Sequence, residues 1–303
     1  MSSPRLSLII ATYNRAAELI RALGSVAAQS AAAEDWECVV VDNNSTDDTA
    51  ERFAQFAENH RDINIRMVRE EQQGLSHARN RGIAESSGEI ITIIDDDERI
   101  CPDFIGTYIK LFDAYPDAAS AGGRIVAEYP SGRPAWMSRW TEQPIANPVD
   151  LGDAVREFPA GRIPGGGNMA IRRCVTERYG VFNTSLGRVG TTLVGGEESD
   201  LFERLSRAGL KCMYVPDAVM YHIIPPEKLT TDYFDRLAFN IGRTQRHRAA
   251  LAGRTVAAAA AECLKWPATV VIALCQLLTG RLQAARRVVR MRRRISAGFF
   301  THS

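Results

Sequence analysis

Short runs of apolar residues, each ending in polar side chains, constrain the fold of this chain more than any other feature. Three of them occupy Leu6–Ala11, Cys38–Val41 and Ile90–Ile94, and segments with apolar residues at helical spacing stand between them. Strands that are apolar throughout and alternate with helices form mostly parallel sheets covered by helices on both faces. The sequence therefore predicts an α/β fold with a Rossmann-like, mostly parallel central sheet.

The later part of the body is less regular. Further strands are predicted at 65–68, near Ile125, at 213–215 and at 219–221, and further helices at 102–115, after Gly196 and at 230–251. Residues 128–162 are rich in Pro, Gly, Trp and Arg and show no clear period. This stretch is predicted to be a long functional loop or a substrate-side insertion.

The net charge of +1 conceals an uneven distribution. Residues 281–303 hold seven of the 37 basic residues and none of the 36 acidic ones, so residues 1–280 carry six more acids than bases. The chain is thus an acidic body with a basic tail. Nucleic-acid binding by the tail is disfavoured, because the body would repel a polyanion.

The six cysteines are spaced singly, without CxxC or close Cys/His pairs. That spacing argues against a zinc site and against a secreted disulfide framework. The N-terminus runs directly into the first predicted strand, without the charged and apolar regions of a signal peptide. We expect a reducing, cytoplasmic environment.

Ligands of open α/β sheets bind outside the carboxyl ends of the strands, so the residues after each apolar run are the candidates for a site. These residues are polar, and they comprise Thr12–Arg15, Asp42–Ser45 and Asp95–Asp97. The first strand is not followed by GxGxxG, which excludes a dinucleotide-binding fold. The Gly-rich, Arg-containing loop expected of a sugar-1-phosphate nucleotidyltransferase is also absent from that place in the sequence.

Asp95, Asp96 and Asp97 follow a strand that we expect to be central and buried. Adjacent carboxylates repel one another, and a divalent cation offsets that repulsion. Hard oxygen ligands select Mg²⁺ or Mn²⁺, which in turn bridges the phosphates of a nucleotide. The alternative is a solvated acidic turn in which Asp97 caps the helix near Pro102.

Several other residues have both a structural and a functional interpretation. Glu197 and Glu198 open a helix, where acids interact favourably with the N-terminus, or they supply a general base. The glycines at 165–167 and Asn168 form either a tight turn or a backbone that approaches a sugar or phosphate closely. Each of these alternatives is open on spacing alone.

Arg79 and His222 are ambiguous in the same way. Arg79 either reaches a phosphate or lies on the surface of its helix. His222 follows a strand-like segment and is, on its own, an ordinary core or surface histidine.

The order of these motifs resembles that of a family 2 glycosyltransferase. The matching segments are Ile9–Arg15, Val40–Asp47, Gly74–Asn80, Asp95–Asp97, Gly166–Ala170 and Gly196–Leu201. The resemblance covers about residues 6–222 and implies the GT-A fold, with inverting transfer of a sugar from a nucleotide-sugar. It implies a catalytic domain at 1–228, with a nucleotide-binding half at about 1–100 and an acceptor-side half at about 101–228, followed by a helical, Arg-rich extension at 229–303.

The resemblance also implies roles for individual residues. Nucleotide binding falls to Thr12, Tyr13, Arg15, Asp42, Asn43, Arg79, Asp95 and Asp96, with Arg79 near the phosphates. The donor sugar or acceptor contacts Gly166, Gly167, Asn168 and Asp200. Mn²⁺ or Mg²⁺ is held by Asp97, Asp95 and His222. Glu198 is the expected base and Glu197 the fallback, although this Glu-Glu pair stands where the family usually has Glu-Asp.

The resemblance leaves the substrates open. UDP is the default donor nucleotide, although Asp42-Asn43 replaces the common Asp-Asp after the second strand. The acceptor is expected to be a glycan or a lipid-linked molecule, in polysaccharide or glycolipid biosynthesis. An alternative is a non-catalytic accessory protein of the same fold that binds nucleotide-sugar or glycan; the sugar, the linkage and the oligomeric state are open.

The C-terminal tail has the pattern of a membrane-associating segment. The apolar run 266–278 has only 13 residues, against the ~20 that a spanning helix needs, and Glu262 and Lys265 precede it. An interfacial or re-entrant segment is therefore favoured over a full span. The Arg-rich stretch that follows has the pattern of a basic amphipathic helix on an anionic membrane. We expect residues 255–303 to contact the cytoplasmic face of a membrane; the alternative is a helix packed on the catalytic domain.

Overall fold

The computed structural model describes residues 3–190 and 195–301, and these form two compact units. The first comprises residues 3–127, 148–190 and 197–223. The second comprises residues 128–147, 195–196 and 224–301. The C-terminal helices therefore group with residues 128–147, a segment that the sequence assigned to the catalytic domain. Each unit is described separately.

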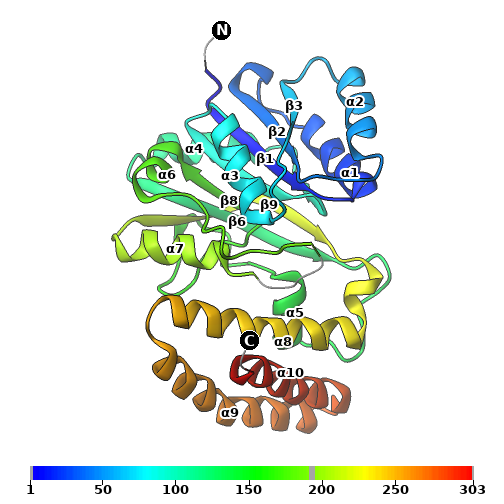
Figure 1. Ribbon diagram of the computed structural model, residues 1–303, viewed down its shortest axis with the longest axis vertical. Coiled ribbons are helices and arrows are strands. Elements are labelled where there is room, and N and C mark those ends of the chain that lie inside the picture. The colour runs from blue at the N-terminus through cyan, green and yellow to red at the C-terminus, as the bar shows by residue number, and fades with distance from the viewer. Residues whose placement is uncertain (1–2, 191–194, 302–303) are drawn as a thin grey trace. The chain divides into compact units, whose positions relative to one another are not determined.

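A single nine-stranded sheet organises the first unit (Figure 1). Its strands are β1 (Leu6–Thr12), β2 (Trp36–Asp42), β3 (Ile65–Arg69), β4 (Ile90–Asp95), β5 (Glu98–Ile100), β6 (Ala118–Glu128), β7 (Arg156–Glu157), β8 (Met169–Arg172) and β9 (Lys211–Ile223). Their order is β3-β2-β1-β4-β8-β6-β9-β5, with β7 paired to β9. β1 to β4 pair in parallel, whereas β8 joins β4 and β6 antiparallel, and β9 joins β5 and β7 antiparallel.

Both faces of β1 are buried, which explains the absence of polar alternation in its sequence. Leu8 and Ile10 belong to the apolar cluster that includes helices α1 (Ala16–Ala27), α2 (Thr49–Asn59) and α4 (Phe104–Ala114). Ile9 belongs to a second cluster with α3 (Leu75–Glu85), α6 (Arg173–Tyr179) and α7 (Glu197–Arg207). Gly82 lets α3 lie close to β1, because a Cβ there would stand 2.4 Å from Cγ2 of Ile9. The predicted α/β fold with helices on both faces is confirmed.

Several strands differ from the prediction, and β8 is among those that the sequence did not indicate. The segments predicted at 213–215 and 219–221 form the single strand β9, which continues through Pro216. β5 was not predicted, because three preceding aspartates make its sequence look like a turn. Within β5, Glu98 and Ile100 are buried and Arg99 is exposed, the alternation of a strand with one covered face.

The stretch predicted as one long loop contains regular structure. Helix α5 (Arg139–Ala146) begins with a capping box in which Ser138 and Thr141 bond each other's backbone, and Asn147 ends it in the left-handed conformation. Pro144 lies inside this helix, and because proline is unfavourable in helix interiors, the sequence pattern did not predict a helix here. β7 lies in the same stretch.

The second unit is helical. A short 3₁₀ turn (Pro226–Leu229) leads into α8 (Thr231–Leu251), α9 (Thr255–Leu278) and α10 (Leu282–Phe300). α8 and α10 pack backbone to backbone: a Cβ on Gly242 would stand 2.0 Å from the carbonyl oxygen of Ile295, and one on Gly298 1.9 Å from that of Phe239. Only small residues permit this approach.

Helix α9 is longer than its apolar run. It spans 24 residues and continues through Pro267, so the 13-residue segment predicted from the sequence is part of a longer helix. By length and composition it is the one helix in the described chain that is able to cross a membrane. Its mean hydropathy is 1.4 over the most apolar 18 residues, and 17% of that window is buried.

The stability of the first unit includes a contribution from one buried carboxylate, which generates a test. Glu37 on β2 is 2% exposed and accepts hydrogen bonds from Ser7 Oγ (2.7 Å), Ser87 N (2.6 Å) and Arg66 Nη1 (2.5 Å). Burial opposes its ionisation, but these bonds lower its pKa below the ordinary value. A lowered pKa stabilises the fold at neutral pH, and this contribution is lost as pH falls through the folded-state pKa.

We therefore expect Glu37→Gln to lower the free energy of unfolding by about 1–3 kcal/mol at neutral pH. The deficit relative to wild type should shrink as the pH falls below the ordinary glutamate range. Urea unfolding at several pH values measures both effects. Glu58→Gln is the control, since that carboxylate is exposed and pairs with Arg61 in the turn that follows its helix; an equal loss in both variants would contradict the assignment.

Candidate active site

The candidate residues gather at the carboxyl ends of β1, β2 and β4, as the parallel topology requires. β1 ends at Thr12, β2 at Asp42 and β4 at Asp95; the register pairs Thr12 with Asp42 and Ala11 with Asp95, so the three strand ends are adjacent. The loop before β8 and the first turn of α7 complete the site within the first unit.

An acidic cluster lies at the end of β4. One ligand oxygen each from Asp95, Asp97 and Glu98 lies within 4.8 Å of the other two. His222 joins it, with Nε2 3.9 Å from Asp97 Oδ2, because β5 and β9 pair Glu98 opposite His222. Burial and the charges of Asp95 and Asp97 raise the pKa of Glu98 well above its ordinary value. A set of crowded, hard oxygen ligands of this kind fits Mg²⁺ or Mn²⁺.

Glu98 was not predicted as a site residue. Its only signal in the sequence is a fourth acid directly after Asp95–Asp97. Its orientation depends on the pairing of β5 with β9, more than a hundred residues away, and no local pattern encodes that pairing.

Asp96 points away from this cluster. Its carboxylate accepts a hydrogen bond from Thr12 Oγ1 at 2.8 Å and forms an ion pair with Arg15 at 2.8 Å. Burial raises the pKa of Asp96 to about 7, although the positive charge of Arg15 opposes that shift. Thr12, Arg15 and Asp96, all predicted to bind nucleotide, thus connect the ends of β1 and β4.

Arg79 has a different environment from the one predicted for it. Its side chain is fully buried, with Nη2 2.8 Å from Asp95 and Nη1 3.1 Å from Glu197 and 2.9 Å from Glu198. Nη2 also lies 3.4 Å from the carbonyl oxygen of Gly166. This guanidinium is enclosed and paired with three carboxylates, and its predicted place near the donor phosphates stays a prediction.

The two glutamates of α7 are not equivalent. The Glu197 side chain is 3% exposed, and burial together with the neighbouring Glu198 raises its pKa to about 8. The Glu198 side chain is 22% exposed, and although burial opposes ionisation, Arg79 lowers its pKa. The pKa values of the two carboxyls thus shift in opposite directions, and such a separation is typical of paired carboxylates with different proton affinities.

The glycine-rich turn makes room for these carboxylates. A Cβ on Gly166 would stand 2.1 Å from Glu198 Oε1, and one on Gly167 would stand 1.9 Å from Glu98 Oε1. The sequence predicted that the missing side chains admit a sugar or phosphate; the structure places two of the protein's own carboxylates there.

Two asparagines predicted to contact ligand form hydrogen bonds with other parts of the protein through their side-chain amides. The fully buried Asn168 accepts from Tyr108 Oη at 2.5 Å and donates to the carbonyl oxygens of Arg124 and Ala218. Asn43 donates to the carbonyl oxygens of Glu70 and Gln72 and accepts from Gly74 N at 2.7 Å. Both amides hold neighbouring segments of backbone, and their predicted ligand contacts stay predictions.

The remaining predicted residues lie around the cluster. Tyr13 is 36% exposed at the end of β1. Asp42 is buried and accepts from Ser45 N at 2.9 Å, which shapes the turn after β2. Asp200 forms an ion pair with Arg204 one turn further along α7.

A family-level comparison agrees with this geometry. The sequence profile described as Glycosyl transferase family 2 matches residues 7–180, more than half of the chain. The chain belongs to this family. It is a glycosyltransferase, and the matched segment contains the strand ends, Arg79 and the acidic cluster.

Two curated relatives are from Haloferax volcanii. The glycosyltransferase AglE is 27% identical over 233 residues, which cover 74% of this chain and 68% of the relative. A glucosyl-dolichyl phosphate glucuronosyltransferase is 25% identical over 254 residues, covering 80% of this chain and 76% of the relative. Both alignments extend beyond the segment matched by the family profile.

A solved structure shares the fold of the glycosyltransferase. It is a mannosyltransferase from Pyrobaculum calidifontis in complex with GDP-Man and Mn²⁺, with a TM-score of 0.63 at 20% identity, covering 96% of this chain and 86% of that one. The predicted GT-A fold is confirmed.

The position of Gly167 generates a second test. We expect Gly167→Ala to displace the Glu98 carboxylate, to break its 2.7 Å bond with Asp95 N and to lower the free energy of unfolding by about 1–3 kcal/mol. Gly24→Ala is the matched control, because nothing lies within 4 Å of a Cβ at this exposed position of α1. A helical Gly-to-Ala change there should stabilise by about 0.5–1 kcal/mol. Chemical denaturation measures both, and equal stabilities would contradict the assignment.

Proposed function

We propose that this protein is a metal-dependent, inverting glycosyltransferase that transfers a sugar from a nucleotide-sugar to a hydroxyl of a glycan or lipid-linked acceptor. The observation that carries the proposal is that Arg79 joins two sets of carboxylates. On one side stand Asp95, Asp97 and Glu98, and on the other stands Glu198, which is 22% exposed and whose pKa Arg79 lowers. Family membership supports glycosyl transfer in glycan or glycolipid biosynthesis.

The reaction needs one base and no covalent enzyme intermediate. Glu198 takes the proton of the acceptor hydroxyl as that oxygen forms a bond to the anomeric carbon. The bond between the anomeric carbon and the donor phosphate oxygen breaks with its electron pair leaving on the nucleoside diphosphate. Attack opposite the leaving group inverts the anomeric configuration. Arg79 keeps Glu198 ionised for this role and orients it through the 2.9 Å hydrogen bond.

Asp95, Asp97 and Glu98, with His222 beside Asp97, would hold Mn²⁺ or Mg²⁺. A divalent cation bound there supplies positive charge to the diphosphate of the donor. Arg15, a third of whose side chain is exposed, pairs with Asp96 and Asp97 and is a second candidate for phosphate contact.

UDP remains our default nucleotide from the family resemblance. GDP is the second choice, since the solved mannosyltransferase holds GDP-Man. Tyr13, Asp42 and the turn that Asn43 stabilises would border the nucleotide.

We also propose that the second unit contacts the cytoplasmic face of a membrane. Helix α9 buries a carboxylate and exposes apolar side chains: Glu262 is 1% exposed and bonds Arg292 and Ser296, whereas Leu264 is 76% and Leu278 88% exposed. Exposed apolar area is unfavourable in water and favourable in a bilayer interface. The name of the dolichyl phosphate relative supports a lipid-linked acceptor, which a membrane would supply.

The base assignment is tested by Glu198→Gln. We expect this variant to lose about 10²–10⁴-fold in transfer rate, because the amide cannot accept the proton, while nucleotide-sugar binding is retained. Glu203→Gln is the control on the same helix, at an exposed carboxylate that pairs with Arg207. Sugar transfer and donor binding are measured in parallel, and wild-type transfer by Glu198→Gln would contradict the mechanism.

Metal dependence is tested by thermal shift with UDP- and GDP-sugars on chelator-treated protein. We expect a donor to raise the melting temperature only with Mn²⁺ or Mg²⁺, since a ligand at a hundred times its Kd adds about 2.7 kcal/mol of stability. Asp97→Asn should abolish the metal-dependent part, whereas Asp48→Asn, at an exposed aspartate on α2 paired with Arg52, should keep it. Equal shifts without metal would contradict the proposal, and binding without transfer would favour the accessory-protein alternative.

A further inference from the structure

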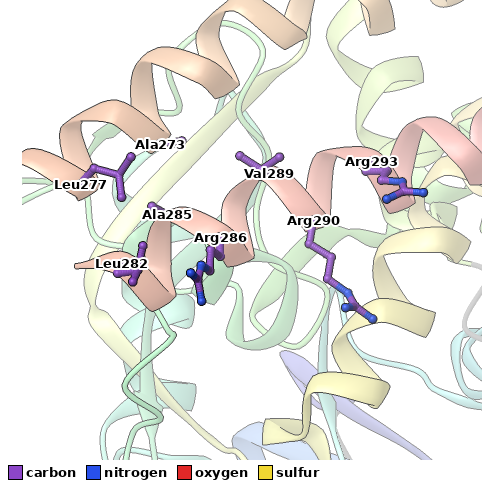
Figure 2. Close-up of a pocket in the computed structure, with 8 residues that line it drawn as sticks. All are labelled: Ala273, Leu277, Leu282, Ala285, Arg286, Val289, Arg290 and Arg293. Carbon is purple, nitrogen blue, oxygen red and sulfur yellow. The ribbon is translucent and has the colours of Figure 1, made fainter. Parts of the chain in front are cut away.

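A groove of about 420 Å³ lies between α9 and α10, within the C-terminal unit. Its floor is apolar and consists of Ala273 and Leu277 from α9 and Leu282, Ala285 and Val289 from α10. Figure 2 shows these apolar side chains gathered between the two helices. Leu277 and Leu282 are each nearly half exposed, so the floor is open to an apolar ligand. The volume lies in the range of about 300–1,000 Å³ that is typical of small-molecule sites.

One edge of the groove is positively charged. Arg286, Arg290 and Arg293 also line it, and Figure 2 shows their side chains extending from α10. Arg290 forms an ion pair with Asp235 of α8. Arg286 and Arg293 are exposed and form no ion pair within the described chain, and their spacing of seven residues puts them on the same side of the helix.

This combination defines the chemistry of the occupant. A purely apolar partner would leave two guanidiniums without a counter-charge, and a free anion would leave the floor in contact with water. A molecule with an apolar chain and a phosphate satisfies both, because guanidinium groups bind phosphate through paired hydrogen bonds. No acidic residue of α10 competes for these arginines.

We propose that the α9–α10 groove binds a single phosphate-bearing lipid, with its headgroup at Arg286 and Arg293 and its chain along the apolar floor. The proposal rests on the membrane contact proposed above, and it adds a defined lipid site to a general attraction to membranes. It assigns these two arginines a role that the five other arginines of residues 281–303 do not share.

The first experiment separates this site from diffuse electrostatics. Three full-length proteins are compared by sedimentation with vesicles: wild type, Arg286→Gln/Arg293→Gln and the matched control Arg236→Gln/Arg243→Gln. One set of vesicles contains phosphatidylcholine alone, and the other contains phosphatidylcholine mixed with phosphatidylglycerol. The control pair lies on α8, is exposed and has the same seven-residue spacing. We expect the groove pair to lose about 25-fold in binding to the anionic vesicles, as each arginine at such a surface contributes about five-fold. The control pair should change less than about three-fold.

The second experiment tests the lipid chain. Monomeric dihexanoyl phosphatidate should bind wild-type protein in solution, and inorganic phosphate at the same concentration should not displace it. Leu277→Gln should weaken this binding several-fold, whereas Leu264→Gln, an exposed leucine of α9 outside the groove, should not. The Mn²⁺-dependent thermal shift by nucleotide-sugar, unchanged in every variant, verifies that the fold and donor site are intact.

Several outcomes would overturn the inference. Equal losses of vesicle binding in the two arginine double variants would show that binding depends on diffuse charge and not on the groove. Displacement of dihexanoyl phosphatidate by inorganic phosphate would show that the groove binds an anion and not a lipid. Concentration-dependent dimerisation that is abolished by Leu277→Gln would show a second copy of the chain in the groove. If wild type fails to bind either vesicle, the proposed membrane contact itself is wrong; if wild type binds and the groove pair matches the control, only the lipid site is wrong.

Discussion

The buried guanidinium of Arg79 is the interaction on which the rest of the site depends. It lies between Asp95 at the end of β4 and the glutamate pair of α7, two elements more than a hundred residues apart in sequence. Without it, three carboxylates would share a poorly solvated space with no counter-charge, which is strongly unfavourable. The same cation lowers the pKa of Glu198, whereas burial and Glu198 raise that of Glu197, so one guanidinium both joins the two elements and separates the proton affinities of the pair.

Much of this arrangement was predictable, because strand ends follow from local patterns. Apolar runs located β1, β2 and β4, the parallel topology implied that Thr12, Asp42 and Asp95 meet, and the order of motifs identified the family. The surroundings that sequence analysis did not predict are those that depend on distant parts of the chain. Helix α7 encloses Arg79, and neighbouring carbonyl oxygens accept hydrogen bonds from the amides of Asn43 and Asn168.

The glycine-rich turn also shows that a sequence pattern does not identify the distant groups that contact it. A run of glycines indicates that something approaches the backbone closely, but it does not specify what. Here the approaching atoms are the carboxylates of Glu98 and Glu198. The C-terminal unit was also only partly predictable. Its arginine-rich composition is evident from the sequence. The burial of Glu262 and the exposure of Leu264 and Leu278, however, depend on how α9 packs on α10.

The pairing of β5 with β9 has a consequence for how the protein acquires its activity. Glu98 owes its position to a strand that ends at Ile223, so the acidic cluster is incomplete while only the first two hundred residues have left the ribosome. The nascent chain can build β1 to β4 from local βα units, but closing this long-range pair comes late, as non-local contacts do in folding. The acidic cluster is therefore complete only after the later strands of the sheet are in place.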